Sequence, residues 1–184
     1  MNKKALAIGQ VFIFIVAAIT FALIMIFGYK AIAGFISSGE DVAFVQFKTS
    51  IETSVKKIYT EFGAIRVEQF RAPAKYTQIC FVNMDFDGDM EGLKDVSLTA
   101  YDAWETAKED RNQRRRNDPN YNGLIYSNAD QNVFLKPAAT APIKVHQITI
   151  NEDQDGFLCE PIRQGSFTVV LEGRGSHTDI GRAE

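Results

Sequence analysis

The sequence predicts an α+β protein with an N-terminal transmembrane helix, an amphipathic linker helix and one extracytoplasmic domain dominated by antiparallel β-sheet. Three patterns predict it. An apolar run extends from Ala5 to Phe27, residues 37–63 carry apolar side chains at helical spacing, and residues 64–173 alternate short Ile-, Val- and Phe-rich segments with turn residues. In a chain of 184 residues, the part beyond the apolar run has room for one domain with its own core.

The apolar run predicts a membrane span. From Val11 to Phe27 the only polar side chain is Thr20. As a helix, which rises about 1.5 Å per residue, the segment from Ala5 to Phe27 would extend roughly 34 Å, enough to cross a hydrocarbon core of about 30 Å. We therefore expect a basic leader at residues 1–9 and a transmembrane helix at residues 10–36.

Two other interpretations of the run are a cleaved secretory signal and the buried helix of a soluble protein. The small-x-small sequence Ala31-Ile32-Ala33 has the form of a cleavage site, but a signal core is usually about 7–15 residues long, and this run is longer. A buried helix in a soluble protein rarely has so few polar groups over such a length. Both alternatives therefore fit the sequence less well than a membrane anchor.

The charges around the run predict its orientation. Lys3 and Lys4 precede it, whereas Lys30 is followed by Glu40 and Asp41. The positive-inside rule then places the N-terminus in the cytoplasm and the rest of this single-pass cell-membrane protein outside. The formal net charge is −3, and the outer domain is more acidic still because three lysines flank the span. We expect the lipid bilayer as a partner, and no nucleic acid.

Residues 37–63 predict the amphipathic linker helix. Ser37 and Glu40 have the spacing of a capping box, so a second helix is expected to begin near Gly39 and to end at Gly63. Its apolar stripe consists of Phe44, Phe47, Ile51, Val55, Ile58 and Phe62. This stripe packs either on the helix's own domain or against other subunits, and the spacing leaves both open.

Residues 64–173 predict the β-rich domain. A helix near residues 93–116 interrupts it and ends at Asp118-Pro119-Asn120. Residues 174–184 are small and polar and are expected to be a flexible tail. Strands are expected at residues 64–70, 76–84, 124–127, 132–135, 143–150, 156–162 and 166–173.

The two cysteines, Cys80 and Cys159, both fall in predicted strands. In a domain outside the membrane, a pair of cysteines predicts one disulfide, and two separate buried thiols are the alternative. Closing a loop of about 80 residues would stabilise the fold by roughly 4–5 kcal/mol in the chain-entropy model.

An acidic loop precedes the predicted helix. Carboxylates alternate along it, as suits a Ca²⁺ ion, but Gly88 and Val96 stand at the wrong positions for an EF-hand. A solvated loop is therefore expected, with a calcium site of another type as the alternative, and no metal site is assigned. The carboxylates belong to Asp85, Asp87, Asp89 and Glu91.

Four arginines cluster at the end of the predicted helix near residues 93–116. Cations at this place interact favourably with the helix dipole. The alternative is an anion-binding patch for lipid headgroups, an acidic glycan or the acidic loop of a neighbouring subunit. The cluster consists of Arg111, Arg114, Arg115 and Arg116.

The sequence contains no pattern that predicts catalysis. The only histidines are His146 and His177, too few for a His-rich metal site. The segment from Gly175 to Asp179 contains the residue types of a Ser-His-Asp triad, but they are too close together in a predicted tail. Without a nucleophile elbow, P-loop or dinucleotide fingerprint, we expect no enzyme, no catalytic residues and no cofactor. A hydrolase using scattered carboxylates is the remaining alternative.

The N-terminus has a basic start, Lys3-Lys4, then Gly9-Gln10, followed directly by the apolar residues Val11-Phe12-Ile13-Phe14. In this order of features it resembles the class III signal of archaeal type IV pilin-like proteins. The resemblance implies cleavage between Gly9 and Gln10 by a prepilin peptidase, after which the apolar helix stays attached and leads into a β-rich outer domain. Ile8 departs from the usual basic residue before the glycine, and Phe14 departs from the Glu of bacterial pilins. The chain is also similar to uncharacterised single-pass archaeal envelope proteins.

These observations lead to two expectations for function. The first is a non-catalytic membrane-anchored envelope protein, a pilin-like or pseudopilin subunit of a surface or secretion apparatus, with copies of itself or other envelope subunits as partners. The alternative is a monomeric, membrane-tethered extracytoplasmic module that binds a ligand.

Overall fold

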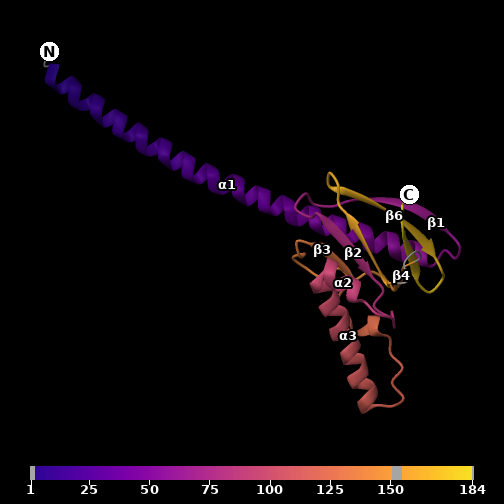
Figure 1. Cartoon of the computed structure of the whole chain (residues 1–184). Coiled ribbons are helices and arrows are strands. Elements are labelled where there is room, and N and C mark those ends of the chain that lie inside the picture. Colours follow the sequence, from indigo (N-terminus) through magenta and orange to yellow (C-terminus); the bar gives the residue numbers. More distant parts are fainter. Residues whose placement is uncertain (1–2, 151–154, 184) are drawn as a thin grey trace. The chain divides into compact units, whose positions relative to one another are not determined.

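The computed structural model describes residues 3–150 and 155–183, and its contacts divide the chain into two units, Met1–Val42 and Ala43–Glu184 (Figure 1). The helices of the described part are α1 (Lys3–Tyr59), α2 (Glu91–Val96), α3 (Leu98–Asn117) and α4 (Ile125–Asn128). The strands are β1 (Ile65–Arg71), β2 (Gln78–Val82), β3 (Val133–Lys136), β4 (Ile148–Ile150), β5 (Phe157–Pro161), β6 (Ser166–Gly173) and β7 (Thr178–Arg182).

Helix α1 is one continuous helix of 57 residues. The sequence predicted an interruption and a new helix near Gly39, and that prediction is wrong. Serine and glycine in a helix interior are unfavourable by only about 0.5–1 kcal/mol each relative to alanine. No proline lies between Ser37 and Gly39, so every backbone N–H remains available for the helical ladder. Because elongating a formed helix is easier than nucleating a second one, the chain stays helical there.

The first unit contains the apolar part of α1. Phe12–Ile32 is long and apolar enough to cross a membrane, and none of this span is buried within the protein. The hydroxyl of Thr20 donates to the backbone oxygens of Val16 and Ala17, at 3.0 and 2.9 Å. The side chain that interrupts the apolar run therefore satisfies its hydrogen on its own helix, as is needed in lipid.

The second unit contains two sheets, and the predicted α+β class is confirmed. In the described part of the chain, one sheet has the strand order β1-β6-β7-β4 and the other β3-β2-β5. Every pairing is antiparallel except that of β4 with β7. Strand β6 alternates half-buried and buried residues along its length, which is the pattern of a sheet with one face on the core.

The end of α1 supplies one side of the main core of this unit. Five members of the predicted stripe are buried, so this face packs on its own domain. The sixth, Phe62, lies beyond the helix end and is 81% exposed. The buried members are Phe44, Phe47, Ile51, Val55 and Ile58.

Strand β2 is buried on both faces because each face meets a different core cluster. Ile79 and Phe81 belong to the cluster with α1. Cys80 and Val82 belong to a second cluster, in which α2 and α3 cover the other face of the β3-β2-β5 sheet. This double cover explains why β2 reads as a continuous apolar run rather than an alternating one.

The C-terminal segment, expected to be a flexible tail, instead forms β7 between β6 and β4. The polar composition of this segment predicted exposure to solvent. The strand is nevertheless buried, because its polar side chains have hydrogen-bond partners within the fold. Thr178 is fully buried and its hydroxyl donates to the backbone oxygen of Val55 at 3.3 Å. Asp179 is 8% exposed and Ile180 fully buried.

Three further elements differ from the expected ones. The helix expected near residues 93–116 is divided into α2 and α3 at Ser97, whose side chain caps α3. The segment 124–127, expected to be a strand, forms the short helix α4. The strand expected over residues 143–150 is reduced to β4 and an isolated bridge between Val133 and Ile143.

Candidate functional site

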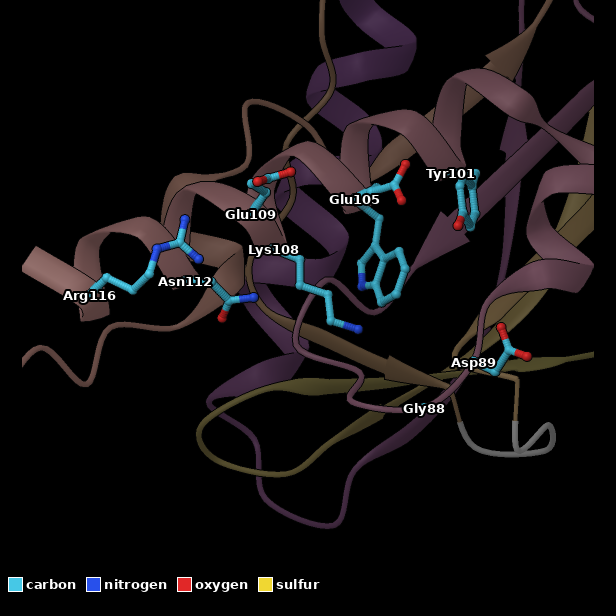
Figure 2. A pocket seen from close by; sticks show the side chains of 9 residues that line it. Gly88, Asp89, Tyr101, Glu105, Lys108, Glu109, Asn112 and Arg116 are labelled. Carbon is cyan, nitrogen blue, oxygen red and sulfur yellow. The ribbon is translucent and has the colours of Figure 1, made fainter. Parts of the chain in front are cut away.

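A cavity of about 370 Å³ lies between α3 and the loop that joins β2 to α2 (Figure 2). We call it the α3 cavity. Its walls are mostly polar and carry both signs of charge, with two aromatic rings among them. It is lined by Gly88, Asp89, Tyr101, Trp104, Glu105, Lys108, Glu109, Asn112 and Arg116.

One face of α3 presents most of this lining. Tyr101, Trp104, Lys108 and Asn112 follow one another at intervals of three or four residues, so they lie along the same side of the helix. The position of the helix is fixed from its start, because the Ser97 side chain accepts a hydrogen bond from the backbone N–H of Ala100 at 3.4 Å.

Two lysines lie over the aromatic rings. Lys108 Nζ is 4.2 Å from the centroid of the Trp104 ring, and Lys94 Nζ is 5.5 Å from that of Tyr101. The two rings are 6.0 Å apart and tilted. Cation–π attraction of this kind, about 0.5–1 kcal/mol at exposed sites, holds each lysine stem along its ring.

Trp104 itself is 5% exposed and its indole nitrogen is buried. Within the described residues, Trp104 Nε1 has no hydrogen-bond acceptor. A buried donor without an acceptor costs about 1–3 kcal/mol. In the sequence, Trp104 is one of the apolar positions of the predicted helix, and Lys108 follows it by four residues. That spacing, which places a cation beside an aromatic ring on one helix face, was the available signal for this cavity.

The four arginines of the suggested anion-binding patch do not gather at one place. Arg111 is half-buried and its Nη2 lies 3.8 Å from Oδ1 of Asp87, in the acidic loop. Arg116 lines the α3 cavity, whereas Arg114 and Arg115 are exposed and outside it. Anion binding by this group remains a prediction.

The acidic loop directs its first carboxylate into the domain. Asp85 Oδ1 accepts the backbone N–H of Tyr126 at 3.1 Å, and Oδ2 accepts the side-chain amide of Gln147 at 2.9 Å. Burial and, after it, the charge of Asp85 raise the pKa of the Tyr126 hydroxyl. In the described part of the chain, no group of three or more His, Cys, Asp or Glu side chains is arranged to hold a metal ion. Calcium binding by the loop stays a prediction.

The residue types of a triad do meet, where the turn between β6 and β7 joins the start of β7. Ser176 Oγ lies 3.0 Å from His177 Nδ1, and His177 Nε2 lies 3.4 Å from Asp179 Oδ1. Asp179 also accepts hydrogen bonds from the Thr149 hydroxyl and from Arg174. Burial disfavours the charged Asp179 carboxylate, but these hydrogen bonds and the nearby cations outweigh it and lower its pKa. The arrangement ties β4, β7 and the turn together.

The predicted disulfide is present between Cys80 and Cys159. The two residues lie directly opposite each other on β2 and β5, with their Cα atoms 4.0 Å apart. Gly9 and Gln10 lie in the N-terminal part of α1, and cleavage between them stays a prediction.

Comparison with protein-family models, with curated proteins and with solved structures finds no match to this chain.

Proposed function

We propose that this chain is a non-catalytic envelope protein anchored in the cell membrane, a type IV pilin-like subunit of a surface or secretion apparatus. The observation that carries the proposal is the continuity of α1. A single helix includes the exposed apolar span Phe12–Ile32 and the buried face that begins at Phe44. The resemblance of the N-terminus implies the same order, an attached apolar helix that leads into a β-rich outer domain.

The disulfide supports an extracytoplasmic place for the second unit. Disulfides form and persist in oxidising surroundings outside the cytoplasm and are rare inside it. The Cys80–Cys159 bond joins β2, the central strand of its sheet, to the edge strand β5. Cys80 is buried and Cys159 is half-buried, so the bond belongs to the folded domain rather than to an exposed surface. Together with the lysines before the span, it favours an N-terminus in the cytoplasm and a domain outside.

N-terminal sequencing of the protein purified from its own membrane tests the pilin-like part. The proposal expects the mature chain to begin at Gln10 and to form filaments or helix-mediated oligomers. The variant Gly9→Leu should block cleavage and retain Met1, whereas Ala7→Leu, two positions earlier, serves as a control that leaves Gly9 in place. An intact Met1 together with a monomer in mild detergent contradicts this proposal.

The second candidate is a monomeric membrane-tethered module that binds a ligand outside the cell. The α3 cavity favours it, because the cavity combines aromatic rings with convergent polar groups, as small-molecule sites do. Saturable binding at this cavity by a monomer that keeps Met1 would favour this candidate over the first.

A further inference from the structure

The α3 cavity has a lining with a mixed chemical character. Lys108 and Arg116 contribute positive charge, whereas Asp89, Glu105 and Glu109 contribute negative charge. Figure 2 shows the labelled side chains of α3 along one stretch of the helix, with Gly88 and Asp89 on the loop beside them. Both hydrogen-bond donors and acceptors therefore line a space of about 370 Å³, within the size range of small-molecule sites.

This mixture disfavours an ion as the ligand. An anion that approaches the two cations also meets three carboxylates, and like charges at short range oppose binding. A metal cation would need several carboxylates around one point, and within residues 3–150 and 155–183 no such group exists. A neutral ligand with many hydroxyl groups suits the lining better, because each hydroxyl can both donate and accept a hydrogen bond.

Trp104 provides an independent indication of a ligand. Trp104 lines the cavity although its exposed fraction is only 5%, and its buried indole N–H has no acceptor in the described part of the chain. Lys108, which lies over the ring at 4.2 Å, is a long side chain held there only by a weak attraction. A movement of Lys108 toward a ligand oxygen would uncover the part of the ring that lies beneath its ammonium group.

We propose that the α3 cavity binds a neutral carbohydrate. The C–H face of a sugar ring packs on Trp104 and Tyr101, while its hydroxyls bond to Glu105, Lys108 and Asn112. This proposal rests on the second candidate function, the membrane-tethered binding module, and names the class of its ligand. Every side chain that it uses belongs to the second unit, so its test does not depend on membrane topology or on cleavage at Gly9.

Trp104 is the only tryptophan of the chain, so its fluorescence reports on the cavity directly. We would titrate the full-length protein with N,N′-diacetylchitobiose and with maltose, both neutral, in a detergent without a sugar headgroup, such as lauryldimethylamine oxide. Inorganic phosphate and glucuronate form the anionic arm. The variant Asn112→Ala removes one polar group of the lining, and Gln113→Ala, on the adjacent exposed position, is the matched control.

The proposal expects a saturable fluorescence change with at least one neutral disaccharide. Asn112→Ala should weaken that binding about tenfold, the effect of one well-placed hydrogen bond, and Gln113→Ala should leave it unchanged. Equal thermal midpoints of both variants and the wild type show that the fold is intact. A response to phosphate or glucuronate alone, no saturable response to either disaccharide, or equal weakening by both variants overturns the proposal.

Discussion

The disulfide between Cys80 and Cys159 makes the sharpest prediction for stability. It closes a loop with a sequence separation of 79 residues. In the chain-entropy model, a loop of this length stabilises the folded state by about 4.5 kcal/mol at 25 °C. A domain of the size of Ala43–Glu184 unfolds with an entropy of roughly 0.3 kcal/mol/K, so the loss corresponds to a fall of about 15 °C in the melting temperature.

The assay is thermal unfolding of the full-length protein in detergent, followed by Trp104 fluorescence, for the oxidised wild type, the reduced wild type and the double variant Cys80→Ala, Cys159→Ala. Reduction removes only the cross-link, whereas the double variant also removes two sulfur atoms from the second core cluster. We therefore expect the double variant to be somewhat less stable than the reduced wild type. The linear dependence of stability on urea should also steepen, because the reduced unfolded chain exposes more surface.

Two results would refute this reasoning. If the denatured, unreduced protein takes up an alkylating reagent at both cysteines, the bond is absent. If the bond is present and its reduction lowers the melting temperature by less than about 3 °C, loop closure does not stabilise this fold as the chain-entropy model requires.

Three further substitutions test the polar contacts of the fold, each by thermal or urea unfolding. Asp179→Asn should lower the free energy of unfolding by about 1–3 kcal/mol because the charged hydrogen bond with Arg174 is lost. Since the pKa of Asp179 is lowered in the folded state, its contribution to stability should persist at neutral pH and decline only below about pH 4. A loss of this contribution already at pH 6 would contradict the reasoning. Asn132→Leu should lower the free energy of unfolding by about 2–4 kcal/mol, because the Asn132 amide accepts from the N–H of Val145 at 2.8 Å and donates to its C=O at 3.2 Å. An unchanged stability would show that the backbone of Val145 finds other hydrogen-bond partners. Tyr126→Phe should lower the free energy of unfolding by only about 0.5–1.5 kcal/mol, because the Val145 carbonyl loses the hydroxyl of Tyr126 but keeps its bond with Asn132. Burial and Asp85 raise the pKa of Tyr126, so in the wild type its ionisation should destabilise the fold only above about pH 10. The variant should lack this decline.

The periodic features of the sequence predicted most of the fold. The apolar run predicted a helix long and apolar enough to cross a membrane, and the stripe from Phe44 to Ile58 predicted a helix face that packs on apolar side chains. Both predictions succeed because they depend only on the local pattern of side-chain types. The disulfide followed from the number of cysteines and the expected compartment. These predictions need no knowledge of distant contacts.

The errors lie where distant contacts decide the structure. Strand β7 contains Thr178 and Asp179 in buried positions, which local polarity assigns to solvent. Their partners, Val55 and Thr149, are remote in sequence, and only the folded chain brings them within reach. The helix break at Gly39 failed for the opposite reason, because cooperative helix extension outweighed a local capping signal.

The α3 cavity was only partly visible in the sequence. The sequence shows Arg116 as a cation at a helix end and the acidic loop as a separate segment. Nothing local in it indicates that Asp89 and Trp104 line the same cavity. That proximity follows from the turn at Ser97, which separates α2 from α3.

In the anchored arrangement that we propose, the two parts of α1 determine how the domain can be released from the membrane. The side chains from Phe44 to Ile58 are part of the interior, so the anchor and the domain share one piece of backbone. A protease that cuts between Ile32 and Phe44 would shed a fragment that retains its whole interior. A cut after Tyr59 would leave that helix in the membrane and strip the shed part of one wall, and the shed part should then collapse or aggregate.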